Sequence, residues 1–202
     1  MGKIMIINGS PRARKSNSKR YADLFAKNCT VSTVYFAVTP KNHVELCKAM
    51  EDFTDVLFVF PLYADGIPVT LIHFLKTLEE NPPKQKPRIS ILINCGFIEP
   101  EQNDVAVKMM RFFCKTQGYA FGSLLRIGSG EAILTTPLKV FVTRKIKKLA
   151  ISVSKGKNEN LKATMPLPKK MFVKASTRYW EDYGKRQGIT REQMAIMEIE
   201  KE

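Results

Sequence analysis

The sequence predicts an α/β protein in which one doubly wound parallel sheet carries helices on both faces. Short apolar runs, too short for independent helices, alternate with segments whose apolar residues recur at helical spacing. Short connections and right-handed crossovers between successive strands then favour a parallel sheet. Unusual loops follow several of these strands, as is expected where an open α/β sheet binds a ligand. The 202 residues suit one domain with a full hydrophobic core, with or without a modest appendage.

The elements of the sheet can be followed in order along the chain. Residues 4–7 form a first apolar run, typical of a strand buried on both faces, and a helix is indicated by the spacing of Tyr21, Leu24 and Phe25. The further elements are expected as strand 31–38, helix 43–50, strand 55–60, helix 67–78, strand 88–94, helix 105–115 and strand 120–127. Five strands therefore alternate with four helices.

Local composition supports these boundaries. The run DVLFVF at 55–60 is rich in β-branched and aromatic residues and ends at Pro61, as expected of a strand. Pro68 stands near the start of the next helix, where a missing amide costs little. Two prolines between Asn81 and Lys86 indicate a loop before the next strand.

Past Thr136 the pattern changes to a strongly basic region. Apolar residues over 138–153 fit one helical face, and lysines and arginines fill much of the remainder. From Lys139 through Arg178 the only acidic residue is Glu159, against twelve Lys or Arg. Three interpretations stay open: a solvated helix face packed on the sheet, attraction for a phosphorylated cosubstrate or an acidic partner, and peripheral attachment to an anionic membrane.

The end of the chain predicts one loop and two helices. Residues 156–168 contain few large apolar side chains and two prolines, which predicts a flexible loop and a candidate cover for the site. Residues 168–186 predict an aromatic-rich helix that could close a homodimer. Thr190 and Gln193 form a capping box for a last short helix.

Composition argues against several classes of protein and site. No run approaches the roughly 18 to 20 apolar residues that cross a bilayer, and the N-terminus enters a strand without a signal-type apolar region, so we expect a cytoplasmic protein. The four cysteines form no CxxC pair, which argues against zinc and iron–sulfur sites and favours reduced thiols. No histidine has a partner at metal-ligand spacing, so we assign neither metal ligands nor catalytic residues. The formal charge of +14 raises affinity for nucleic acid, anionic lipid and phosphorylated ligands alike.

The loop between the first strand and the first helix is a candidate anion site. It reads GSPRARKSNS over residues 9–18. The first amides of a helix lack intrahelical partners, and the helix dipole places about half a positive charge at that end. Serine, asparagine and arginine side chains add donors and fixed charge, so a phosphate monoester is well matched, although Ser16 or Asn17 could simply cap the helix. The spacing fits neither GxxxxGK[ST] nor GxGxxG, which excludes an ATPase loop and a dinucleotide fingerprint.

Three loops together resemble those of the flavodoxin-like NAD(P)H-dependent FMN reductases. GSPR at 9–12 with SNS at 16–18 resembles the phosphate loop of that family. PLYADGIP at 61–68 resembles the loop that borders the flavin ring, and NCGF at 94–97 resembles the loop at its other edge. The resemblance covers roughly residues 1–131. It implies a flavodoxin-like three-layer sandwich with a five-stranded parallel sheet in the order 2-1-3-4-5 and a helical C-terminal extension.

The resemblance also implies which residues hold FMN. Tyr63, on a proline-bounded turn, suits either a flat ring or packing on the sheet rim when it is judged from the residues alone. In the family, the phosphate and ribityl groups would contact Ser10, Arg12, Ser16, Asn17 and Ser18. The ring would lie among Pro61, Leu62, Tyr63, Ala64 and Asp65 on one loop and Asn94, Cys95, Gly96 and Phe97 on the other. Gly128 to Glu131 rank second, near the flavin or the nicotinamide.

We therefore expect an FMN-binding domain over residues 1–135 and a basic helical extension over 136–202 that packs on the same domain. The implied activity is hydride transfer from NADH or NADPH to bound FMN, and then reduction of a quinone, a nitroaromatic compound or free flavin. The alternatives are a flavodoxin-type electron carrier that serves protein partners and a flavodoxin-like binding protein that uses its basic tail. Expected partners are a small electron acceptor and a second copy of the chain, with no specific nucleic acid and with membrane contact not favoured.

Overall fold

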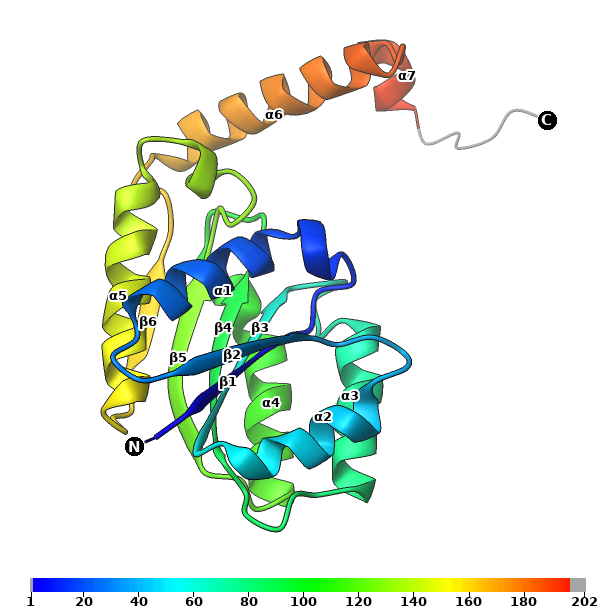
Figure 1. Cartoon of the computed structure of the whole chain (residues 1–202). Helices are drawn as coiled ribbons and strands as arrows, with labels where there is room; N and C mark the ends of the chain where they lie inside the picture. The colour runs from blue at the N-terminus through cyan, green and yellow to red at the C-terminus, as the bar shows by residue number, and fades with distance from the viewer. Residues whose placement is uncertain (1, 197–202) are drawn as a thin grey trace, which may run out of the picture. The chain divides into compact units, whose positions relative to one another are not determined.

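The computed structural model describes residues 2–196 and divides the chain into two units, one through Met165 and one from Pro166 onward. A parallel sheet of six strands forms the centre of the first unit (Figure 1). The strands are β1 (Ile4–Asn8), β2 (Thr33–Ala37), β3 (Asp55–Pro61), β4 (Arg88–Asn94), β5 (Phe121–Ile127) and β6 (Asn160–Ala163). Their order across the sheet is β2-β1-β3-β4-β5-β6, which confirms the doubly wound topology that the sequence predicts.

Strand β6 corrects the sequence analysis, which predicts five strands and a flexible loop over 156–168. Leu161 and Ala163 are buried while Asn160 and Lys162 are exposed, the alternation of a half-buried edge strand. A segment of four residues between glycine and prolines is too short for this alternation to be recognised in the sequence.

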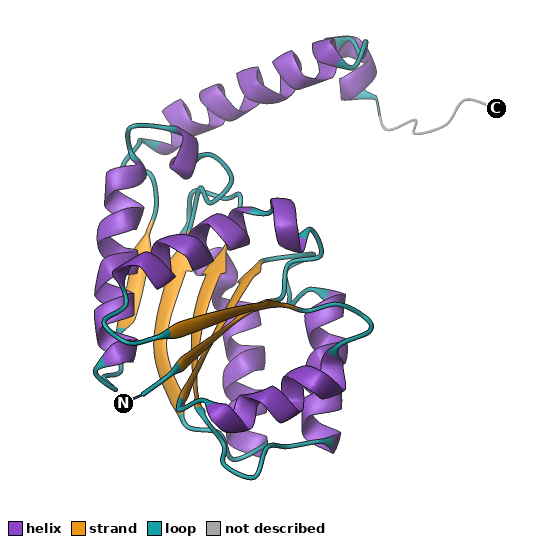
Figure 2. Cartoon of the chain, in the orientation of Figure 1, coloured by secondary structure: helices purple, strands orange, loops and turns teal. Residues whose placement is uncertain are grey.

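Helices cover both faces of the sheet (Figure 2). One face carries α1 (Asn17–Asn28) and α5 (Lys139–Ser154), which pack side by side. The other face carries α2 (His43–Ala49), α3 (Val69–Glu80) and α4 (Asp104–Thr116). Short 3-10 helices lie at Ala13–Lys15, Met50–Asp52, Pro100–Asn103 and Ile133–Thr135.

The connection through α5 has an unusual hand. β1-α1-β2 and β5-α5-β6 cross the sheet in opposite directions, yet their helices lie on the same face, so the two crossovers have opposite hands. β3-α3-β4 has the hand of β1-α1-β2, because both its direction and its face are reversed. β5-α5-β6 is therefore an exception to the right-handed rule on which the sequence analysis relies.

Apolar side chains fill both layers between the sheet and the helices. All five residues of β1 are buried, and β3 and β4 are buried almost throughout. On the α2–α4 side, the rings of Phe58 and Phe74 lie with centroids 6.1 Å apart. On the α1 side, α5 buries Val142, Ile146 and Leu149. Residues 136–165, which the sequence analysis assigns to the extension, thus belong to the first unit.

The second unit contains α6 (Lys169–Arg186) and α7 (Arg191–Ala195). The capping box of α7 is confirmed: Thr190 Oγ1 accepts from Gln193 N at 3.2 Å, and Gln193 Oε1 accepts from Thr190 N at 2.8 Å. On α6, the Trp180 ring packs edge-on against Tyr183, with centroids 5.9 Å apart. Packing of the extension on the first unit, and a homodimer through α6, stay predictions. Among residues 2–196, no helix combines the length and the apolar character needed to cross a bilayer.

Candidate functional site

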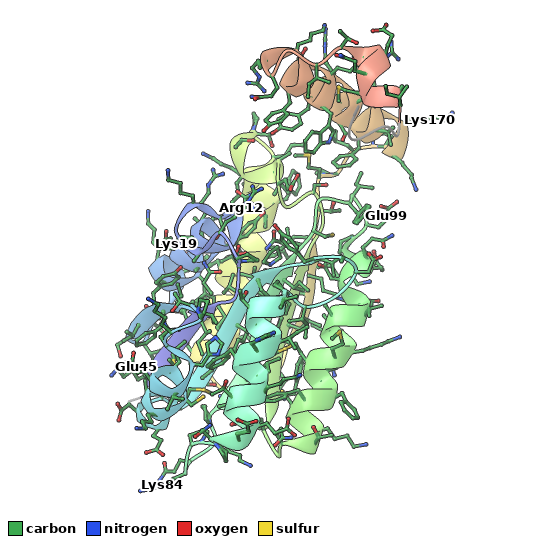
Figure 3. The ribbon with its side chains drawn as sticks, turned by 90° about the vertical axis from the view of Figure 1, so that its right-hand side faces the viewer. Arg12, Lys19, Glu45, Lys84, Glu99 and Lys170 are labelled. Carbon is green, nitrogen blue, oxygen red and sulfur yellow. The ribbon has the colours of Figure 1, made fainter. Side chains whose placement is uncertain are left out.

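A pocket of about 370 Å³ lies at the carboxyl ends of β1, β3 and β4. The strand order reverses between β1 and β3, and open α/β sheets bind ligands at such a switch point. Figure 3 shows Arg12 and Glu99 near this end of the sheet and Lys84 near the opposite end. The lining consists of Ser10, Arg12, Lys15, Ser16, Asn17, Ser18, Pro61, Leu62, Tyr63, Ala64, Asn94 and Glu131.

Most of the residues expected to hold FMN therefore meet at one pocket. They come from the loop before α1, from the segment after β3 and from the end of β4. The four expected residues outside the lining are Asp65, Cys95, Gly96 and Phe97. Asp65 sits beside Ala64 in the same turn, and Phe97 is 52% exposed on the neighbouring loop.

Asn8, the last residue of β1, holds the loop before α1 in place. Its side chain is fully buried, and its Nδ2 donates to Ala13 O at 3.1 Å and to the Tyr35 hydroxyl at 2.9 Å. Its Oδ1 accepts from Ser10 N at 2.9 Å. One amide side chain thus ties both ends of the loop to the sheet, because buried polar groups strongly favour satisfied hydrogen bonds.

Ser16 is the N-cap of α1. Its Oγ accepts from Lys19 N at 3.1 Å and donates to Ala13 O at 3.0 Å. The capping alternative is therefore correct for this hydroxyl, which has no proton left to donate to a ligand. Ser10 differs, because its Oγ is only an acceptor, from Arg12 N at 3.4 Å.

The positive end of α1 points at the pocket. Asn17 and Ser18 are its first helical residues, so their backbone amides precede the first intrahelical bond. No acidic residue stands in the first turn, and Arg12 and Lys15 lie on the loop just before it. Amides, cations and the helix dipole together make this end of the pocket attractive to an anion.

A tight turn forms the other end of the pocket. Tyr63 N donates to Gly66 O at 3.1 Å and Gly66 N to Tyr63 O at 2.9 Å, which closes a two-residue hairpin turn. The central residues Ala64 and Asp65 both have positive φ, +43° and +56°, as in a type I′ turn. Non-glycine residues adopt this conformation at a cost of order 1 kcal/mol each, and such strain is concentrated at functional sites. Tyr63 is 47% exposed and lies in the pocket lining.

Asn94 joins the loops around the pocket. Its buried Nδ2 donates to Phe60 O at 3.1 Å and to Ser18 Oγ at 3.3 Å, and its backbone oxygen accepts from Leu62 N at 2.7 Å. The end of β4 is thereby linked both to the end of β3 and to the first turn of α1.

Cys95 faces away from the pocket. Asn103 Nδ2 donates to its sulfur at 3.3 Å, and burial raises the pKa of the thiol, so it is a packed thiol and not a reactive thiolate. Its backbone oxygen accepts from Gly130 N at 2.7 Å, while Gly130 O accepts from the buried Tyr21 hydroxyl at 2.8 Å. These bonds brace the loop that carries Glu131 into the lining.

Sequence reasoning missed two contributors to the site, Asn8 and Lys15, and ranked a third, Glu131, too low. Asn8 is the single polar residue at the end of an apolar strand, a signal that was available. Lys15 was grouped with the basic loop but not assigned to the site, and Glu131 was ranked second. Glu131 brings a negative charge to the pocket rim, close to Gly96: a Cβ added at Gly96 would lie 3.7 Å from its carboxylate.

No protein-family model matches the chain, and no curated protein matches it in sequence. Solved structures match in fold. The chain is 12% identical to the rubredoxin oxygen:oxidoreductase of Desulfovibrio gigas (TM-score 0.60), covering 77% of this chain and 36% of that one, so it spans about a third of that protein. It is 12% identical to a Streptococcus pneumonia flavodoxin (TM-score 0.55), covering 76% and 98%. It is 11% identical to the NAD(P)H:quinone oxidoreductase of Methanothermobacter marburgensis (TM-score 0.54), covering 75% and 96%.

At these identities the matches show that the chain has a flavodoxin-like fold. Their names include a flavodoxin as well as oxidoreductases, and likeness of fold alone does not choose between the candidate activities. The choice between them therefore rests on the chemistry of the pocket.

Proposed function

We propose that the protein is an FMN-dependent NAD(P)H oxidoreductase that reduces a small acceptor such as a quinone, a nitroaromatic compound or free flavin. One observation carries this proposal: the pocket combines a cationic, amide-rich end with an end lined by a proline, a leucine and an exposed tyrosine. FMN has the same two-part character, a phosphate and a flat ring with apolar faces.

The cationic end of the pocket carries hydrogen-bond donors and charges that fit a phosphate group. Ser10 Oγ has a free proton, Arg12 offers a forked cation and Lys15 a point charge. Gly9 lets the loop run close to α3, because a Cβ there would lie 2.8 Å from Leu71 Cδ2. The volume of about 370 Å³ lies within the range of small-molecule and cofactor sites.

At the other end, the chain's own residues would position the ring and exclude water. Bound FMN supplies the electron-accepting ring, while nicotinamide supplies hydride. The amides of Leu62 and Tyr63 are already bonded within the protein, so the turn can offer the amides of Ala64 and Asp65 and the face of Tyr63. Glu131 is the one acidic side chain in the lining, and its backbone oxygen accepts from Asn17 Nδ2 at 3.4 Å.

Anaerobic absorbance spectroscopy of the full chain, after addition of FMN, tests the proposal. Visible flavin bands that bleach on addition of NADPH or NADH are the expected result. Bound flavin that neither nucleotide bleaches would favour the electron carrier. Failure of the protein to take up FMN would contradict the assignment of the pocket.

A matched pair of variants links binding to the pocket. Arg12→Ala with Lys15→Ala is expected to weaken FMN affinity at least about 10-fold, because a hydrogen bond to a charged group is worth roughly 1.5–3 kcal/mol. The control, Lys41→Ala with Lys76→Ala, removes the same charge from exposed sites on the α2–α3 side. Equal losses in both pairs would show that overall charge, and not the pocket, attracts the flavin.

A further inference from the structure

A second concave surface lies between α5 and the loop that leads into β6. It encloses about 330 Å³, and we call it the basic groove. Its lining consists of Arg144, Lys147, Lys148, Ile151, Ser152, Lys155, Lys157 and Glu159. The groove precedes β6, whereas the candidate cofactor pocket follows β1, β3 and β4, so the two sites lie at opposite ends of the parallel sheet (Figure 1).

The groove holds more positive charge than the fold requires. Five cations face one carboxylate, Glu159, which Lys148 pairs at 3.2 Å. Cations in the last turn of a helix complement its dipole, but α5 carries none there, so Arg144 and Lys147 lack that structural explanation. Mutual repulsion of the remaining cations is unfavourable unless an external anion approaches.

The loop that forms one wall of the groove is fixed by the fold. Gly156, with φ +68°, ends α5 in a Schellman motif: Gly156 N donates to Val153 O at 3.0 Å and Lys157 N to Ser152 O at 2.9 Å. Arg88 Nη1 donates to Gly156 O at 2.5 Å. The flanking lysines are therefore carried on a backbone of set shape.

Two buried serines, Ser123 on β5 and Ser152 on α5, hold the same loop by hydrogen bonds. Ser123 Oγ and Ser152 Oγ lie 2.7 Å apart, and both are within 3.0 Å of Lys157 O. Ser123 Oγ also accepts from Glu159 N at 3.0 Å. The backbone that carries Lys157 and Glu159 is thus ordered before any ligand binds, which lowers the entropy cost of binding.

We propose that the basic groove binds the phosphate backbone of double-stranded nucleic acid without reading its sequence. Four of its five cations are lysines, which act as point charges on phosphate and not as planar base readers. No aromatic side chain is among its lining residues, so unpaired bases find no stacking platform there.

The size of the row of cations supports a polyanion. Arg144 and Lys155 are eleven residues apart, about 16 Å along the helix direction, over which a duplex presents roughly ten phosphate charges. With Lys148 paired to Glu159, about four cations contact phosphate, and counterion release then gives a slope of about −3.6 for log affinity against log salt. Affinity should fall about 150-fold between 50 and 200 mM KCl.

Fluorescence anisotropy of the full-length chain with labelled 20-base-pair DNA duplexes of two unrelated sequences tests the proposal. Lys147→Glu with Lys155→Glu should make the slope of log affinity against log salt less steep by about 1.8 and weaken binding about 60-fold at 100 mM KCl. Lys41→Glu with Lys76→Glu changes net charge equally on the opposite face and should show a much smaller loss. Far-UV circular dichroism and urea unfolding verify that both pairs remain folded.

The expected result is equal affinity for the two sequences, the steep salt dependence, and a loss confined to the groove variant. Equal loss in both variants would assign binding to net charge and overturn the groove. Tighter binding to vesicles of phosphatidylserine, or to polyglutamate, than to duplex at the same salt would overturn the proposed partner. FMN binding is expected to be unchanged in the groove variant, so nucleic-acid binding by the groove and flavin binding by the pocket succeed or fail separately.

Discussion

Replacing Asn8 by alanine tests how the loop before α1 is held. The change removes three side-chain hydrogen bonds of 2.9 to 3.1 Å, to Ala13 O, the Tyr35 hydroxyl and Ser10 N, and a longer fourth one of 3.4 Å to Ser16 Oγ. At about 1 kcal/mol of net stability each, with buried partners left unsatisfied, the free energy of unfolding should fall by about 3 kcal/mol. A loop that is no longer fixed must be ordered by the ligand, so FMN affinity should fall about 10-fold.

Urea unfolding followed by far-UV circular dichroism gives the first quantity, and flavin titration by fluorescence gives the second. Asn81→Ala is the matched control, because Asn81 makes an exposed bond to Thr77 O at the end of α3 and should change either quantity little. A free energy of unfolding of Asn8→Ala within about 0.5 kcal/mol of that of the unsubstituted chain is the effect of a neutral surface change. That result, or an unchanged flavin affinity, would show that Asn8 does not organise the loop.

Further predictions concern a cap, a glycine and a histidine. Ser16→Ala should cost about 1–2 kcal/mol of stability as a lost N-cap, whereas Ser10→Ala should lower FMN affinity with little change in melting temperature; the reverse pattern would exchange their roles. Gly128→Ala should destabilise by about 2 kcal/mol, since its Cβ would lie 2.5 Å from Ile98 O, and unchanged urea unfolding would contradict this close approach. Burial lowers the pKa of His43, so the unfolded state binds a proton on this side chain more readily than the folded state does. The stability that neutral His43 contributes is therefore lost as the pH falls below about 6.5. His43→Gln should show a smaller fall in melting temperature between pH 7 and pH 5 than the unsubstituted chain.

Periodicity in the sequence was sufficient for the five main strands and for α1 to α5. DVLFVF and ISILIN are long enough, and apolar enough, to indicate strands buried on both faces, and the spacing of Val142, Ile146 and Leu149 indicates one face of a helix. The same local signals place the polar loops at the carboxyl ends of the strands. For that reason most of the expected FMN contacts lie around one pocket, while their role in binding flavin stays a prediction.

Tertiary structure decided which of these side chains are free to meet a ligand. Ser10 and Ser16 carry the same kind of side chain and lie six residues apart in the sequence. Only the fold shows that the Ser16 hydroxyl already donates its hydrogen bond to Ala13 O, whereas the Ser10 hydroxyl accepts from Arg12 N. Cys95 similarly reads as part of a site loop, yet its side chain turns into the protein because Asn103, from a different segment, provides its partner. Hydrogen-bond partners distant in sequence are not encoded in local spacing.

The sequence by itself determined the class of fold and the loops that surround the pocket, because both depend on local apolar patterns and on general rules of connection. The strand order up to β5 came from the family resemblance of those loops. Only the tertiary structure decided that the chain adds β6 through a crossover of unusual hand, that Asn8 and Asn94 tie the loops together, and that lysines from α5 and the following loop face one another across a groove. These features depend on contacts between segments that only the folded chain brings together.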